Sequence, residues 1–85
     1  MWENTTSYTQ GEEKSEIRTT SINVDGLKLT VTKYSGYGNH LVMHCHTLGI
    51  STKYLDETDM EKAQLKAIEI VKAKAKKILY AIEQI

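Results

Sequence analysis

The feature that most constrains this fold is a C-terminal segment that contains neither glycine nor proline. It begins at Thr58-Asp59-Met60-Glu61, whose spacing is that of a capping box: the Thr58 hydroxyl and the Glu61 carboxylate can each accept a hydrogen bond from an unpaired backbone N–H. No helix-breaking residue follows before Ile85. We therefore expect one helix of about 25 residues, rising about 1.5 Å per residue.

This expected helix is amphipathic. At about 100° per residue its apolar side chains fall on one broad stripe, which comprises Met60, Ala63, Ala67, Ile70, Val71, Ala75, Ile78, Leu79 and Ile82. The opposite arc carries five lysines, namely Lys62, Lys66, Lys72, Lys76 and Lys77. Lys74 lies inside the apolar stripe, where its aliphatic stem can extend past the edge of a core.

The segment before the helix alternates between apolar and polar residues, as strands with one buried face do. Asp25-Gly26 predicts a tight hairpin, because both positions of a two-residue turn require positive φ. The face expected to be buried in the strand after this turn comprises Leu27, Leu29 and Val31. We expect a second turn over residues 35–39.

The next strand, up to the break at Gly49, places two sets of side chains on opposite faces. One face carries Leu41, Met43 and Cys45, and the other carries His40, Val42, His44 and His46. The expected fold class is α+β: a three-stranded antiparallel meander packed on one long C-terminal helix. Residues 50–55 can add a short fourth segment at the edge.

The first sixteen residues lack a core-forming pattern. They are mostly polar and acidic, so residues 1–16 are predicted to form a flexible N-terminal arm, followed by one β-β-β-α domain over residues 17–85. Trp2 and Tyr8 are the two aromatic exceptions, which could anchor the arm in a partner's groove.

Composition excludes several classes of protein. Eleven basic residues balance eleven acidic ones, which argues against a general polybasic nucleic-acid binder. A single cysteine excludes an internal disulfide framework and fits a reducing compartment. No apolar run is long enough to cross a membrane, and the N-terminus lacks the pattern of a secretion signal. The sequence is therefore predicted to be cytoplasmic, without a membrane partner.

No catalytic constellation is apparent, and we expect neither enzymatic activity nor a cofactor. His44 and His46 point the same way in a strand and could chelate Zn²⁺, but further ligands are missing, so no metal site is predicted. Cys45 shares its face with Leu41 and Met43, so it is interpreted as a small buried hydrophobe rather than a nucleophile.

Two groups of residues are candidates for binding. Between Lys66 and Tyr80 five lysines stand against Glu69 alone, a local charge of +4 that could meet phosphates or an acidic protein surface, or simply be solvated. Tyr34 and Tyr37, with Lys28, Lys33 and the histidines of the sheet face, could form a stacking platform for single-stranded RNA, or be ordinary solvent-facing residues.

The order of elements and several short runs resemble the β-β-β-α domain, partly RNase H-like, of HicB-type antitoxins. The matching runs are Leu29-Thr30-Val31, Leu41-Val42-Met43-His44-Cys45-His46, Leu48-Gly49-Ile50-Ser51-Thr52 and the acidic stretch from Leu55 to Ala63. In that family the domain binds and neutralises a ribonuclease toxin and does not itself catalyse. In format the chain is also similar to phage-encoded inhibitors of host toxin or defence nucleases, which would act in the host cytoplasm.

These observations predict a non-enzymatic, antitoxin-like binding protein that neutralises a nuclease by direct binding. The alternative is a small RNA-binding protein that uses the lysine face, and the two functions are compatible. The residues expected to bind a partner or RNA are Lys62, Lys66, Lys72, Lys76, Lys77, Tyr34, Tyr37, His44 and His46.

A homodimer is also predicted, because a helix of this length outreaches strands of about seven residues. The large aliphatic side chains expected beyond the sheet, and hence in the dimer interface, are Ile78, Leu79, Ile82 and Ile85.

Overall fold

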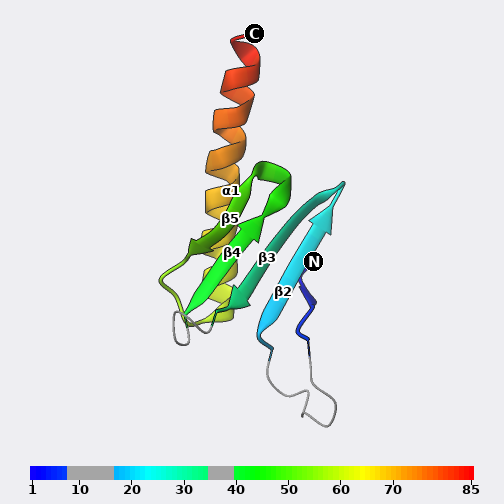
Figure 1. The fold of residues 1–85 in the computed structure, drawn as a ribbon, viewed down its shortest axis with the longest axis vertical. Coiled ribbons are helices and arrows are strands. Elements are labelled where there is room, and N and C mark those ends of the chain that lie inside the picture. The colour runs from blue at the N-terminus through cyan, green and yellow to red at the C-terminus, as the bar shows by residue number, and fades with distance from the viewer. Residues whose placement is uncertain (8–16, 35–39) are drawn as a thin grey trace.

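The computed structural model describes residues 1–7, 17–34 and 40–85. Within them the chain forms one antiparallel sheet, in the order β1-β2-β3-β4-β5, and one long helix (Figure 1). The elements are β1 (Glu3–Asn4), β2 (Thr19–Val24), β3 (Leu27–Lys33), β4 (Leu41–Cys45), a 3₁₀ turn η2 (His46–Leu48), β5 (Ile50–Tyr54) and α1 (Met60–Glu83). The predicted α+β meander is confirmed, with β5 as the fourth strand and β1 as a fifth.

The hairpin between β2 and β3 turns where the sequence predicts it. Asp25 and Gly26 have φ angles of 50° and 83°, and Val24 pairs with Leu27 across the turn. Positive φ at two successive positions is what a two-residue hairpin of this twist requires. This turn fixes the register of the two longest strands of the sheet.

The core lies between α1 and the face of the sheet formed mainly by β3 and β4. The strands contribute the alternating residues predicted for this face, and the buried ones are Leu29, Val31, Leu41, Met43 and Cys45. From the helix, Ala63, Ala67 and Val71 complete the cluster, together with Leu55 from the segment before α1. Cys45 is fully buried here, as predicted.

The start of the helix differs from the predicted capping box by one residue. The N-cap is Asp59, whose Oδ2 accepts from the backbone N of Lys62 at 3.0 Å. Glu57 Oε1 accepts from the backbone N of Thr58 at 3.1 Å and of Asp59 at 3.3 Å. The predicted cap by Thr58 is therefore wrong: the carboxylates on either side of it satisfy the free N–H groups.

The first residues of the segment predicted as a flexible arm pair with the sheet. Glu3 pairs with Ser21 and Asn4 with Thr20, so β1 forms the edge beside β2. Trp2 is half-buried against the core. Residues 8–16 of the predicted arm, including Tyr8, lie outside the described residues.

The end of β4 also differs from the prediction. Cys45 is the last residue of the strand, and His46 belongs to the turn η2. Gly49 then follows with a φ of 71°, a left-handed conformation that glycine adopts without strain. The strand does not continue past Gly49, as predicted. It ends earlier, however, so His46 is not part of it.

The C-terminal half of α1 extends past the ends of the strands (Figure 1). All three fully packed helix residues, Ala63, Ala67 and Val71, come from its first half. Beyond the sheet Ile78 is half-buried, whereas Leu79, Ile82 and Ile85 are exposed. The overhang predicted from the lengths of the elements is therefore present.

Candidate functional site

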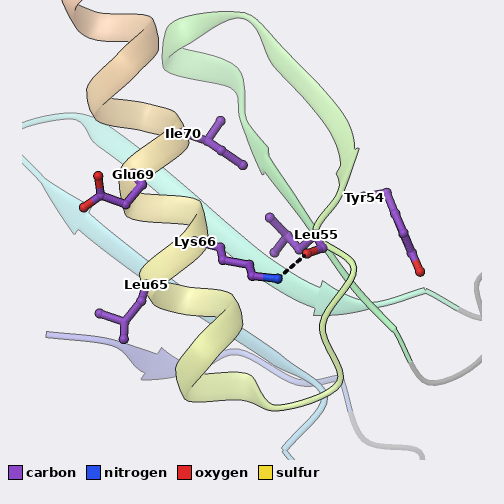
Figure 2. Close-up of a pocket in the computed structure, with 6 residues that line it drawn as sticks. All are labelled: Tyr54, Leu55, Leu65, Lys66, Glu69 and Ile70. Carbon is purple, nitrogen blue, oxygen red and sulfur yellow. Dashed lines mark hydrogen bonds between the residues drawn. The ribbon is translucent and has the colours of Figure 1, made fainter.

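Two adjoining hollows lie between β5 and α1. The first, about 410 Å³, is shown in Figure 2 and is lined by Tyr54, Leu55, Leu65, Lys66, Glu69 and Ile70. The second, about 320 Å³, is lined by Ile50, Lys53, Ile70, Ala73, Lys74 and Lys77. Ile70 lines both, so the two hollows are neighbours, and together we call them the β5–α1 groove.

Lys66 links α1 to the segment that follows β5 through hydrogen bonds of its side chain. Its Nζ donates to the backbone carbonyl of Leu55 at 3.3 Å, the contact drawn in Figure 2, and to that of Asp56 at 3.4 Å. It also lies 3.7 Å from Glu57 Oε2. Lys66 thus fastens the segment after β5 to the helix.

Glu57 is the acidic residue that pairs with Lys66 at this position. Backbone hydrogen bonds from Asp59 and Thr58, helped by the charges of Lys66 and Lys62, lower the pKa of its carboxyl. The first of these bonds has the largest effect. Glu57 therefore remains negatively charged at neutral pH and holds both the helix start and Lys66.

The structure divides the predicted lysine face into two groups. Lys66 and Lys77 line the groove, where they are joined by Lys74 and by Lys53 from β5. The other three, Lys62, Lys72 and Lys76, are exposed and line neither hollow. The second hollow is lined by three lysines and no acidic residue, so it is the more positive end of the groove.

Sequence reasoning missed Lys53 and treated Lys74 only as an exception in the apolar stripe. A cation placed among apolar helix positions was a usable signal that this part of the stripe borders an opening rather than a core. Lys53 carried no comparable signal, because its place beside α1 depends on the pairing of β5 with β4.

The opposite face of the sheet carries a third hollow of about 240 Å³, lined by Lys28, Thr30, His44 and His46. The two imidazole rings lie 5.4 Å apart between centroids and are tilted by 43°. Burial, followed by the neighbouring charges of His46 and Lys28, lowers the pKa of His44 below its ordinary value of 6.5. His44 is therefore held in its neutral form at neutral pH.

The histidines and the helix lysines do not share a surface. His44 stands between Met43 and Cys45, which face α1, so its side chain points to the other side of the sheet. Tyr34 is exposed just after β3, and Tyr37 lies outside the described residues. The structure thus brings His44 and His46 together but separates them from the lysines of α1.

Among residues 1–7, 17–34 and 40–85, no group of three or more histidine, cysteine, aspartate or glutamate side chains gathers where it could hold a metal ion. The same residues contain no helix that is both long and apolar enough to span a membrane.

Comparison of the chain with protein families, with curated proteins and with solved structures finds no match. The resemblance to HicB-type antitoxins therefore stays a prediction from the sequence.

Proposed function

We propose that this protein is a non-enzymatic, antitoxin-like inhibitor that neutralises a nuclease by binding it directly. The observation that carries the proposal is the half of α1 that extends beyond the sheet. It combines large exposed apolar side chains, among them Leu79 and Ile82 at 57% and 58% exposure, with exposed lysines such as Lys76. Such a mixture of apolar and charged side chains on a rigid element is typical of a protein-binding surface.

The choice of a nuclease as target follows from the resemblance to HicB-type antitoxins, whose similar domain binds a ribonuclease. A basic helix face is complementary to an acidic protein surface, and such complementarity accelerates association and selects the partner. We infer that the partner presents acidic residues around an apolar centre.

RNA binding is the second candidate, and the hollow lined by Lys28, Thr30, His44 and His46 is the observation that favours it. Imidazole rings can stack on bases while a lysine contacts phosphate. This site would use the sheet face opposite α1. The two candidates therefore predict effects of substitutions on different faces.

The test uses the full chain as bait in an extract of the source cells from which nucleic acid has been removed. Lys76→Glu on α1 and Lys28→Glu on the sheet face are a matched pair, because both reverse one exposed charge. The proposal predicts that a nuclease is captured, that its activity is blocked, and that Lys76→Glu weakens capture while Lys28→Glu does not.

The opposite pattern would support RNA binding instead. In that case capture would depend on added RNA and be sensitive to Lys28→Glu. The affinity would also fall with salt, with a slope of log K against log salt of about −0.7 per phosphate contact.

A further inference from the structure

We infer that the β5–α1 groove binds an extended acidic segment of the partner, which adds a strand to the outer edge of β5. The inference rests on the proposed function, because it specifies the shape and chemistry of the partner segment. Groups of three kinds converge at this place: strand backbone, apolar side chains and lysines.

The first of these groups is the backbone at the outer edge of β5. β5 is the last strand in the sheet order, and its inner edge pairs with β4. Among the described residues no strand pairs with its outer edge, and the side chains from Ser51 to Tyr54 are exposed. An edge of this kind offers backbone N–H and C=O groups to an incoming extended peptide.

The second group consists of apolar side chains that line the groove. Ile70 lines both hollows, Leu65 also lines the first and Ala73 the second. Alternate side chains of an added strand point to the same side. Those on the side of α1 would enter the two hollows in turn, so the groove suits a strand rather than a helix.

The charged side chains that line the groove indicate the chemistry of the segment that binds there. Lys53, Lys74 and Lys77 line the second hollow with no acidic residue, while Lys66 and Glu69, of opposite charge, both line the first. We therefore assign an apolar side chain to the first hollow and an aspartate or glutamate to the second. Pairing of two β5 edges from two copies is disfavoured in the register that sets one Lys53 opposite the other.

The test uses the full chain, labelled for NMR, and a short synthetic peptide in which every second residue is valine and glutamate in turn, with threonine at the positions between, so that one face of the strand carries both side chains. One control peptide has lysine in place of glutamate. A second keeps the side chains but is N-methylated at alternate amides, which removes the hydrogen bonds of an added strand. The glutamate peptide is expected to shift the amide signals of Ile50–Tyr54, and both controls are expected to bind at least about tenfold more weakly.

Two double substitutions locate the site. Lys74→Glu with Lys77→Glu should weaken binding of the glutamate peptide by about tenfold or more. Lys72→Glu with Lys76→Glu changes the net charge by the same amount, at exposed positions outside the groove. This double substitution should leave peptide binding nearly unchanged. Equal effects of the two doubles, unshifted β5 amides, or undiminished binding of the N-methylated peptide would each overturn the inference.

The outcome is separable from that of the proposed function. If the protein inhibits the nuclease but binds no acidic peptide in the groove, only the inference about the groove is wrong. If the peptide binds as expected and no nuclease is inhibited, the proposed function is wrong and the groove remains a site for acidic strands.

Discussion

At the scale of single residues, two alanines determine how closely α1 approaches the sheet. Ala63 and Ala67 are both fully buried and pack in the cluster that contains Met43 and Cys45. A side chain that ends at Cβ allows the helix backbone to come near the strands. Larger side chains at these positions would have to displace close-packed neighbours.

We therefore expect Ala67→Leu to lower the free energy of unfolding by about 1–3 kcal/mol, the usual effect of overpacking. Ala75→Leu is the matched control, because Ala75 lies on the same helix but is exposed. Leucine and alanine have similar helix propensities, so the control should change stability little. Denaturant unfolding of both variants measures the difference, and equal stabilities would contradict the packing described here.

The lowered pKa of His44 predicts a pH dependence of stability. The folded state holds His44 neutral more strongly than the unfolded chain does, so the unfolded chain binds more protons once the pH falls below 6.5. Stability contributed by this group is complete above that pH and is lost as the pH falls through the lowered pKa.

His44→Gln should flatten the change in denaturant midpoint between about pH 7.5 and pH 5.5. His46→Gln should reduce the change only in part, because the charge of His46 is the second of three causes of the shift, after burial. An unaltered pH dependence in His44→Gln would show that another group is responsible.

At the scale of elements, the start of α1 depends on a pair of carboxylates that flank Thr58. Asp59 accepts from the backbone of Lys62, and Glu57 accepts from the two N–H groups before the helix. The capping-box pattern placed the cap one residue early, because threonine and aspartate are both good N-caps. Backbone geometry, rather than residue type, selects between them.

This assignment predicts that Asp59→Ala costs about 1 kcal/mol of stability, as the loss of an N-cap usually does. Thr58→Ala is the neighbouring control and should cost much less. Thermal or denaturant unfolding compares the two variants. A larger loss for Thr58→Ala would restore the capping box in place of the Asp59 cap.

Most of the secondary structure was predictable from the sequence, since alternation and the absence of glycine and proline are local signals. The alternation of Leu41, Met43 and Cys45 identified the face of β4 that packs on α1, but Val42, expected on the outer face, is also buried, at 1% exposure. β1 was not predictable, because a two-residue strand such as Glu3–Asn4 forms by pairing with β2 and not through a pattern of its own.

The candidate site was predictable only in part. The lysines of α1 were visible from their spacing, but the groove arises where β5 and the helix meet. Lys53 and Lys74 become neighbours of the same hollow only in the folded molecule. The separation of His44 from the helix lysines likewise required knowing which sheet face α1 covers.

At the scale of the whole molecule, the mismatch between helix and sheet is the main feature (Figure 1). α1 has 24 residues, or about 36 Å, whereas β3, the longest strand, has seven, or about 23 Å. The sheet therefore covers one half of the helix, and the other half carries the half-buried Ile78 and the exposed Leu79, Ile82 and Ile85.

A second copy is the partner expected in the isolated protein, and a nuclease that binds the same side chains would have to displace it. Burial of each of these side chains in a twofold interface would stabilise it by about 1.5–3 kcal/mol. Sedimentation should therefore show a species of twice 9.7 kDa. Leu79→Asp should dissociate it, with circular dichroism as the check that the helix persists. A clean monomer of the unaltered chain at micromolar concentration would contradict the homodimer.

The central claim is that the protein blocks a nuclease by occupying it, without chemistry of its own. It is tested most directly by titrating the captured nuclease with the purified protein while measuring cleavage of a fluorescent RNA or DNA substrate. The account predicts that activity falls linearly to near zero at a fixed molar ratio, and that dissociating the complex restores it. Full nuclease activity in the presence of excess protein would contradict the claim.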